Sequence, residues 1–183
     1  MAYNTIILSG LPGSGKSTLL KNLAEIYNWE KYSIGDMWRA RWKEEYPRGE
    51  VLFEEFWRTT TIEDNRRINE EALEIMRRGK TIWDSRFSVY YTRNLPILQV
   101  FLHTDLRVRA QRAIETSKYG KDKTEEEIAE ILTAREQDEV RMGRTLYGAD
   151  FDYRFPSLYH LRLDSSRLSI DKELQMIGSR MNF

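Results

Sequence analysis

Short apolar runs alternate with longer amphipathic stretches along the 183 residues of this chain. This alternation is typical of βαβ units, in which helices cover a parallel sheet. The apolar runs predict five strands, near residues 4–9, 31–33, 80–84, 98–103 and 158–163. The amphipathic stretches predict six helices, near residues 16–27, 36–46, 63–78, 105–117, 124–146 and 170–180. We therefore expect an α/β fold of three layers, with a five-stranded parallel sheet between helices.

Polar residues mark several of the expected helix boundaries. Asp105 is placed to cap the helix that follows it. Thr124, with a glutamate three residues later, has the pattern of a capping box. Gly79 is expected to end the helix that precedes it. These signals fix the ends of three helices independently of hydrophobic period.

Two stretches, residues 47–62 and 117–123, lack a clear period. Each follows an expected α/β element, where substrate flaps and lids commonly occur, but an ordinary surface loop explains each equally well. Trp38 and Trp57, in or near the first stretch, fit either local packing or the lining of a base pocket.

A glycine-rich segment directly follows the first strand and matches G-x-x-x-x-G-K-[ST], the pattern of a phosphate-binding P-loop. Its glycines allow a tight turn in which backbone N–H groups face a polyphosphate, and the positive end of the next helix attracts the same anion. Lys16 is placed to reach the β- and γ-phosphates, and Ser17 to ligate Mg²⁺. The expected ATP-binding residues are Gly10, Leu11, Pro12, Gly13, Ser14, Gly15, Lys16, Ser17 and Thr18.

Further charged residues stand where phosphoryl transfer needs them. Asp84 ends the third strand and can hold the Mg²⁺ shell through water, or cap the next turn. Forked guanidinium donors suit phosphate recognition, and the candidates are Arg39, Arg86, Arg135 and Arg141. A spacing of six places Arg135 and Arg141 on different faces of one helix, so only a lid that folds over a cleft brings both to it.

Composition narrows the function classes. A formal net charge of zero with 32% charged residues argues for a soluble protein and against a general binder of nucleic acid. The absence of cysteine excludes disulfides and thiolate zinc sites. The apolar runs are too short for a membrane span, and the first residues lack a signal-peptide pattern. We expect a cytoplasmic monomer with small-molecule nucleotide partners and neither membrane nor nucleic-acid partners.

In order, over nearly the whole chain, the motifs resemble those of nucleoside monophosphate kinases, above all the archaeal-type cytidylate kinases. Gly35-Asp36-Met37-Trp38-Arg39-Ala40 is similar to G-D-M-L-R-A of adenylate kinases, whose arginine grips the acceptor phosphate. Asp84-Ser85-Arg86 stands where these kinases carry an acid or glycine pair before a second phosphate-binding arginine. Gln111-Arg112-Ala113 resembles their E-R-I, whose arginine stacks on adenine at the first hinge of the lid.

The second half of the chain carries the more specific resemblance. Arg135-Glu136 through Arg141, followed by Leu146-Tyr147-Gly148, is similar to the archaeal R-E-x-x-E-x-R-R-Y-x-x-x-Y-G run. Leu163-Asp164-Ser165-Ser166-Arg167-Leu168-Ser169 resembles the closing I-N-T-S-x-L-S, which passes beside the adenine.

The resemblance implies a single kinase domain that uses ATP and Mg²⁺ to phosphorylate CMP or dCMP. Its core is expected near residues 1–34, 79–117 and 150–183, its flap for the acceptor near 35–78, and its lid near 118–149. The implied catalytic residues are Lys16, Arg86, Arg135 and Arg141, and Arg112 joins the ATP site. The implied acceptor-binding residues are Asp36, Arg39, Asn65, Asn69 and Arg86.

The chain departs from the archaeal pattern at two aspartates of E-I-D-x-x-I-D, which are Asn65 and Asn69 here. Asparagine both donates and accepts hydrogen bonds, so the preference for base or sugar changes with it. A kinase of AMP, of another deoxynucleotide or of a small metabolite is therefore the alternative, with Asp36 as base for an alcohol acceptor. A non-catalytic switch that responds to ATP is the third hypothesis.

Overall fold

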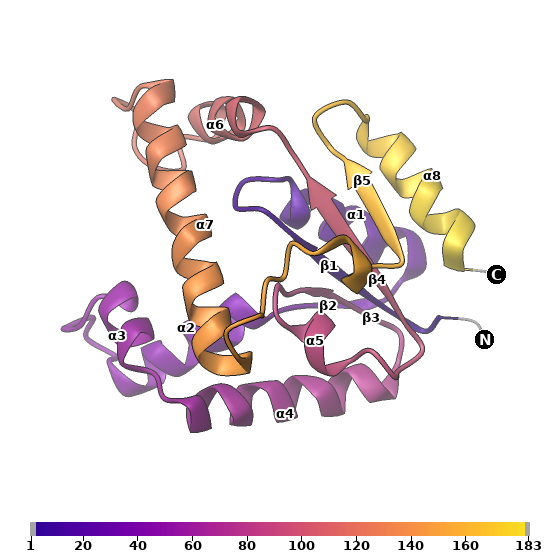
Figure 1. Cartoon of the computed structure of the whole chain (residues 1–183), viewed down its shortest axis with the longest axis horizontal. Helices are drawn as coiled ribbons and strands as arrows, with labels where there is room; N and C mark the ends of the chain where they lie inside the picture. Colours follow the sequence, from indigo (N-terminus) through magenta and orange to yellow (C-terminus); the bar gives the residue numbers. More distant parts are fainter. Residues whose placement is uncertain (1–2, 182–183) are drawn as a thin grey trace.

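The computed structural model describes residues 3–181 and shows a five-stranded parallel sheet with helices on both faces (Figure 1). The strand order is β2-β3-β1-β4-β5, and every neighbouring pair is parallel. The strands are β1 Thr5–Gly10, β2 Glu30–Ser33, β3 Thr81–Asp84, β4 Ile97–His103 and β5 Leu161–Asp164. The expected α/β class with five parallel strands is confirmed.

The helices that alternate with these strands lie within two residues of their predicted bounds. They are α1 Lys16–Tyr27, α2 Ile34–Glu45, α4 Ile62–Arg78, α6 Leu106–Glu115, α7 Glu125–Tyr147 and α8 Ile170–Met181. Thr124 and Glu127 form the predicted capping box, and Gly79 ends α4 with a φ of 75°. Asp105 does precede α6, but its side chain makes no capping hydrogen bond, so that prediction is wrong in its mechanism.

Three short helices were not predicted, namely α3 Phe53–Thr59, α5 Ser88–Tyr91 and the 3₁₀ turn η1 Pro156–Leu158. In α3, burial of Phe56 against Trp38 stabilises a helix too short to show a period of its own. The last strand begins at Leu161 rather than at residue 158, because Pro156 opens the 3₁₀ turn. The stretch at residues 47–62 is therefore partly helical.

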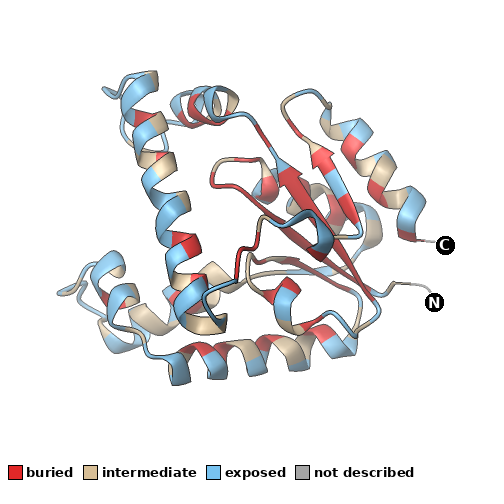
Figure 2. Ribbon diagram, viewed as in Figure 1, coloured by how far each residue is buried: buried red, intermediate tan, exposed pale blue. Residues whose placement is uncertain are grey.

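The sheet separates two hydrophobic layers, and its central strand β1 is buried along its whole length (Figure 2). On one face, Leu19 and Leu23 of α1 and Ile177 of α8 pack against alternate strand residues such as Ile6. On the other face, Ala72 and Met76 of α4 pack under Ile7 and Trp83. Since successive strand residues point to opposite faces, both layers are built from the same short strands.

The long helix α7 stands beside the sheet rather than on it, running from α6 at its first turns toward α4 at its last (Figure 1). Ala110 and Ala113 of α6 pack against Ile128 and Leu132 of α7. At the other end, the Asn69 side-chain amide of α4 donates a hydrogen bond to the hydroxyl of Tyr147, at 2.7 Å. The expected lid, residues 118–149, contains α7, and the expected flap, residues 35–78, contains α2 to α4; both divisions stay predictions.

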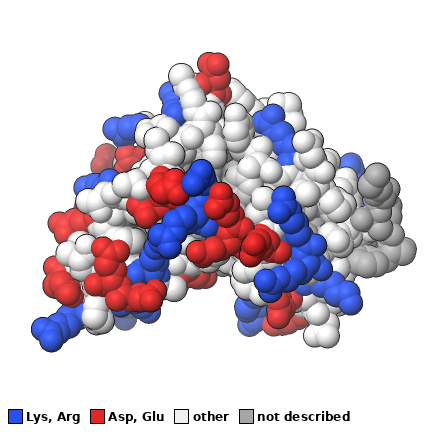
Figure 3. Space-filling model, turned by 90° about the horizontal axis from the view of Figure 1, so that it is seen from below, with Lys and Arg blue, Asp and Glu red and all other residues white. Residues whose placement is uncertain are grey.

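The face that carries α4, seen from below, mixes acidic and basic side chains (Figure 3). Arg66 of α4, for example, forms ion pairs with Glu63 at 2.9 Å and with Glu70 at 3.8 Å. Such exposed pairs contribute little stability, but they leave this face with charges of both signs. Among the helices of residues 3–181, none combines the length and apolarity that a membrane span requires.

Gly143 of α7 is required by the packing of Phe151 and provides a test of how α7 is held. A methyl group at Gly143 would lie 2.3 Å from the Phe151 ring. We expect Gly143→Ala to lower the free energy of unfolding by about 1–2 kcal/mol, because overpacking outweighs the better helix propensity of alanine. Urea denaturation measures the change.

The matched control is Gly178→Ala in α8, where the nearest atom to the added methyl is 3.5 Å away. We expect this variant to be unchanged or more stable by up to about 1 kcal/mol. If both variants shifted stability equally, the contact between Gly143 and Phe151 would not constrain α7.

Candidate functional site

The P-loop joins β1 to α1 and is shaped by its glycines. Gly10 lies so close to β4 that a Cβ there would be 2.4 Å from the Leu102 carbonyl oxygen. Gly13 and Gly15 have φ values of 80° and 97°, which disfavour residues with a side chain. The loop thus turns tightly at the carboxyl edge of the sheet, where α1 begins with N–H groups that have no partner within the helix.

Lys16 is folded over the loop and almost fully buried, with 5% of its surface exposed. Its Nζ donates to the carbonyl oxygens of Gly10 and Leu11, each at 3.0 Å, and to Ser14 Oγ at 3.4 Å. Burial, reinforced by the positive charge of Arg86, lowers the pKa of Lys16 to about 7. A bound polyphosphate would supply the negative charge that this buried ammonium lacks.

Asp84 and Arg86 reach this region from the end of β3, which pairs with β1 so that Asp84 is in register with Leu8. Ser85 between them is held by a hydrogen bond from its N–H to the Leu8 carbonyl oxygen, at 3.0 Å. Both charges act on Lys16, Asp84 raising its pKa and Arg86 lowering it. The parallel pairing of β1 and β3 therefore brings Lys16, Asp84 and Arg86 to one edge of the sheet, as the sequence predicts.

A buried carboxylate on α7, Glu139, joins two of the predicted arginines. Its Oε2 lies 2.6 Å from Arg86 Nε, and its Oε1 accepts a hydrogen bond from Arg135 Nε at 3.1 Å. The Tyr153 hydroxyl donates to Oε2 at 3.2 Å, and burial together with the charge of Glu139 raises the pKa of this phenol, which stays protonated. Arg86 of the core and Arg135 of α7 thus meet at one acid.

A second acid, Glu136, ties the same helix to the P-loop. It forms ion pairs with Arg109 of α6 at 3.4 Å and with Arg154 at 2.8 Å. Arg109 is itself buried and donates to the carbonyl oxygen of Pro12 in the P-loop, at 3.2 Å. Because Glu136 and Glu139 are three residues apart, they lie on one face of α7, and that face is turned toward the P-loop.

Glu136, Glu139 and Arg109 were not among the predicted site residues. Glu136 and Glu139 stand at the two glutamate positions of the archaeal R-E-x-x-E-x-R run, which is a signal that could have singled them out. The spacing of Arg135 and Glu139 by itself suits an exposed helical ion pair equally well. Burial is what distinguishes them: Glu139 and Arg109 are 6% and 4% exposed. That quantity depends on the packing of α7 against the core and has no local sequence signal.

Arg112 of α6 bridges the P-loop and the loop after β5. Its Nη1 donates to the Ser14 carbonyl oxygen at 3.4 Å and to Ser165 Oγ at 3.3 Å, and its Nη2 donates to the Ser165 carbonyl oxygen at 2.7 Å. The guanidinium also lies 3.5 Å from the Cβ position of Gly15. Arg112 therefore lies beside the P-loop and contacts the 163–169 segment, which the resemblance expects to pass beside the adenine.

Apart from Arg86, which follows β3, the predicted acceptor residues lie on α2 and α4. Arg39 Nη2 pairs with Asp36 at 2.6 Å, and both side chains are largely exposed. The Asn65 side chain is buried and donates to the Thr61 carbonyl oxygen at 2.9 Å, within the first turn of its own helix. Asn69 instead bonds to Tyr147 of α7, whose pKa burial raises to about 12.

Arg141, unlike the predicted catalytic arginines Arg86 and Arg135, does not contact Glu139. Its side chain is 73% exposed and pairs with Asp138 at 2.5 Å on the outer side of α7. This is the consequence of the six-residue spacing from Arg135, since the two side chains leave the helix in different directions. A catalytic role for Arg141 stays a prediction that would require α7 to rotate.

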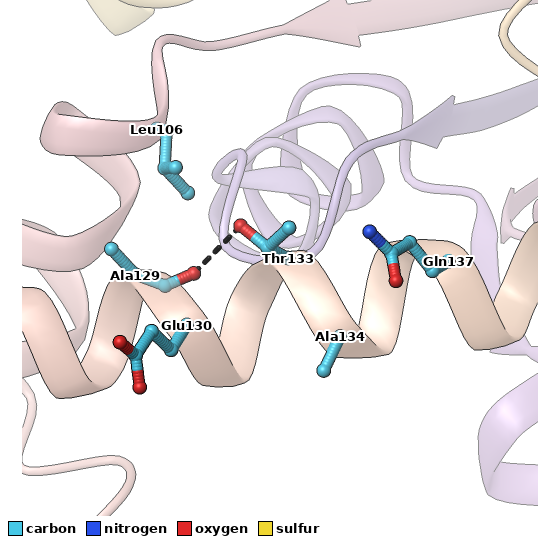
Figure 4. Close-up of a pocket in the computed structure, with 6 residues that line it drawn as sticks. All are labelled: Leu106, Ala129, Glu130, Thr133, Ala134 and Gln137. Atoms are coloured by element: carbon cyan, nitrogen blue, oxygen red, sulfur yellow. Dashed lines mark hydrogen bonds between the residues drawn. The ribbon is translucent and has the colours of Figure 1, made fainter.

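Two hollows lie near these elements. One, of about 350 Å³, opens between α6 and α7 and is lined by Leu106, Ala129, Glu130, Thr133, Ala134 and Gln137 (Figure 4). It shares no residue with the groups around Glu139. The other, of about 100 Å³, lies among α2, α3 and the start of α4, and is lined by Trp38, Arg41, Glu45, Phe56, Thr59, Thr60 and Asp64.

Comparison with known proteins agrees with this geometry. The family model described as AAA domain matches residues 6–133. The cytidylate kinase of Methanopyrus kandleri is 31% identical, over 97% of this chain and 92% of its own length. That of Pyrococcus furiosus is 30% identical, over 91% and 82%.

The fold also occurs in the shikimate kinase of Bacteroides thetaiotaomicron. The two structures align over 98% of each chain, with a TM-score of 0.60 and 17% sequence identity. At that identity the likeness concerns the fold alone. The two cytidylate kinases match at higher identity and over most of their length. Together with the AAA-domain match, they show that the chain belongs to the family of the archaeal cytidylate kinases.

Proposed function

We propose that this protein transfers the γ-phosphoryl group of ATP to a nucleoside monophosphate, with CMP or dCMP as the acceptor. The observation that carries the proposal is that Arg86 of the core and Arg135 of α7 converge on Glu139, at 2.6 and 3.1 Å, while Lys16 lies over the P-loop and Asp84 ends the strand that pairs with β1. Positive groups from the P-loop, the core and α7 at one point suit the charge that develops on a transferring phosphoryl group. The kinase names of the relatives support the same reaction.

In the proposed reaction, an oxygen of the acceptor phosphate forms a bond to the γ-phosphorus while the bond to the ADP oxygen breaks. No general base is needed, because the acceptor oxygen is already ionised. The P-loop amides and Lys16 bind the donor phosphates, and Arg86 and Arg135 hold the transferring group. Closure by α7 excludes water, which would otherwise compete as the attacking group.

Ser17 and Asp84 fit a Mg²⁺ site. Ser17 is exposed at the start of α1, and Asp84 lies at the end of β3 close enough to raise the pKa of Lys16. A hydroxyl and a carboxylate are the hard oxygen donors that Mg²⁺ prefers, with water and phosphate oxygens completing its shell. When bound, Mg²⁺ would neutralise charge on the β- and γ-phosphates.

The flap supports an acceptor that carries both a phosphate and a polar ring. Arg39 on α2 offers a guanidinium for the phosphate. The hollow of about 100 Å³ places Arg41 and Asp64, a donor and an acceptor, beside the aromatic rings of Trp38 and Phe56. Trp38 is in the lining and Trp57 is not. Asn65 and Asn69 replace two aspartates of the archaeal pattern, and this difference bears mainly on which base the acceptor carries.

The direct test is a coupled assay of ADP release with ATP and Mg²⁺ against AMP, CMP, dCMP, UMP, dTMP and GMP, with a control lacking acceptor. Strong preference for CMP or dCMP is the expected result. Preference for another monophosphate would correct the acceptor alone. Slow ADP release that ignores every acceptor would contradict the kinase proposal and favour an ATP-dependent switch.

Replacement of Lys16 by methionine tests the donor site. We expect Lys16→Met to reduce turnover by at least about 10²-fold, because the buried ammonium no longer stabilises charge on the phosphates. The melting temperature should change by only a few degrees, since methionine keeps the length of the side chain. Normal turnover in a folded variant would remove Lys16 from the mechanism.

Arg39→Ala tests the acceptor site. We expect the KM of the acceptor to rise about 10- to 100-fold, the equivalent of one or two charge-assisted hydrogen bonds, while the KM of ATP changes little. Arg66→Ala on α4 is the matched control, because Arg66 is exposed and paired only with acids of its own helix. An unchanged acceptor KM would leave Arg39 a surface residue.

The pKa of Lys16 predicts a proton uptake on nucleotide binding. At pH 8 the free enzyme holds Lys16 mostly neutral, since its pKa is about 7. Bound phosphate favours the ammonium and raises that pKa, so ADP binding should take up a proton at pH 8 and less as the pH approaches 6. Calorimetry at pH 8 in two buffers of different ionisation enthalpy should give different binding enthalpies, and Lys16→Met should abolish the difference.

A further inference from the structure

Glu139 is an acid at the point where the proposed reaction needs positive charge. Its carboxylate is 6% exposed and lies between Arg86 and Arg135. A buried carboxylate is costly unless it is paired and hydrogen-bonded. Oε1 of Glu139 accepts a hydrogen bond from Arg135 and Oε2 accepts one from Tyr153, while Arg86 contributes an ion pair to Oε2 without a hydrogen bond from its Nε. The arrangement is therefore a built one rather than a chance contact of surface charges.

The two arginines present the same atom to Glu139. In each, the contact is made by Nε, on the side of the guanidinium nearest the chain. The Nη nitrogens at the far end, which form the fork that binds phosphate oxygens in pairs, make no hydrogen bond to Glu139. The hydrogen bond directs the guanidinium of Arg135, and the ion pair holds that of Arg86 close to the same carboxylate, in both cases without using the end that recognises phosphate.

The two arginines also come from parts of the molecule that are separate in the chain. Arg86 follows β3 of the core, whereas Arg135 lies on α7, inside the expected lid. The charges of both act on Lys16. Glu139 thus links the orientation of an arginine of the core to that of an arginine of the lid, beside the P-loop lysine.

We propose that Glu139 is a positioning residue for phosphoryl transfer, holding Arg86 and Arg135 as one two-armed phosphate clamp. This inference rests on the proposed function, because it assigns both arginines to the transferring group. Displacement of a reacting group by about 1 Å can cost about 10²-fold in rate, so the role of Glu139 is expressed in kcat. It touches neither substrate and acts through the arginines.

Glu136 offers the comparison that separates positioning from mere support. It is also an acid on the inner face of α7, and it also pairs with two arginines, but these are Arg109 and Arg154. If any break in the ion pairs of α7 slowed the enzyme, Glu136→Gln and Glu139→Gln would have equal effects on kcat. If Glu139 positions the clamp, only its replacement lowers kcat strongly.

The experiment measures kcat, both KM values and the melting temperature for the whole protein with ATP, Mg²⁺ and its best monophosphate. We expect Glu139→Gln, which keeps the size of the side chain but removes its charge and replaces one accepting oxygen by a donating NH2, to lower kcat about 10- to 100-fold without raising the KM of ATP. Glu136→Gln should lower the melting temperature at least as much but kcat several-fold less. Glu130→Gln, an exposed acid of α7, should leave all four quantities unchanged.

A double-mutant cycle tests whether Glu139 acts through Arg135. The effects of Glu139→Gln and Arg135→Ala on kcat should be strongly non-additive, so that the double variant is little slower than Arg135→Ala alone. Additive effects would overturn the proposal. So would an unchanged kcat in Glu139→Gln, an equal loss in Glu136→Gln, or faster turnover with tighter ATP binding, which would make Glu139 a competitor of phosphate.

Failure of the proposed function has a different signature. In that case the wild-type protein would transfer phosphate to none of the monophosphates, before any variant is compared. The Glu139 proposal would then be judged by ATP hydrolysis without acceptor, in which the same arginines meet the γ-phosphate. An equal hydrolysis rate in wild type and Glu139→Gln would overturn it there too.

Discussion

Buried charge at the junction of α7 and the core is the constraint on which the site depends. The P-loop, β3 and α6 bring Lys16, Arg86 and Arg109 to the carboxyl edge of the sheet. Lys16 and Arg109 are buried and Arg86 is partly buried, so each charge would be costly there without a partner. Glu136 and Glu139 of α7 neutralise the two arginines. Because these acids share one face of one helix, the charge balance also determines where α7 lies relative to the P-loop.

The positive charge of Lys16, unlike those of Arg86 and Arg109, has no carboxylate partner among the described residues, and this matters for phosphate binding. The lysine finds carbonyl oxygens and a hydroxyl but no carboxylate within its hydrogen bonds, and its pKa falls to about 7. A lysine that was already paired with a carboxylate would gain little free energy from binding an anion. A lysine whose pKa is lowered by burial has an unfavourable charged form, which a bound polyphosphate stabilises strongly. The lysine therefore contributes to the affinity for the polyphosphate.

Close packing around α7 reinforces the electrostatic contacts. Gly143 admits the Phe151 ring against the helix, and the Tyr147 hydroxyl takes a hydrogen bond from Asn69 of α4. The helix is thus held at its start by α6, in its middle by Arg86 and Arg109, and at its end by α4. One element therefore touches the ATP-binding loop, the proposed transfer site and the expected acceptor flap.

The sequence alone predicted the sheet, the P-loop and most helix ends, because these follow from local signals: the apolar period, the spacing of the glycines, and the capping box at Thr124. It also placed Lys16, Asp84 and Arg86 together, since parallel strands end at a common edge. It did not reveal α3, a helix of seven residues that is too short to show a period and that buries Phe56 against Trp38. Nor did it reveal Glu139, Glu136 or Arg109, or show that Arg141 faces away. Those depend on which face of α7 turns toward the core, and only burial against distant residues decides that.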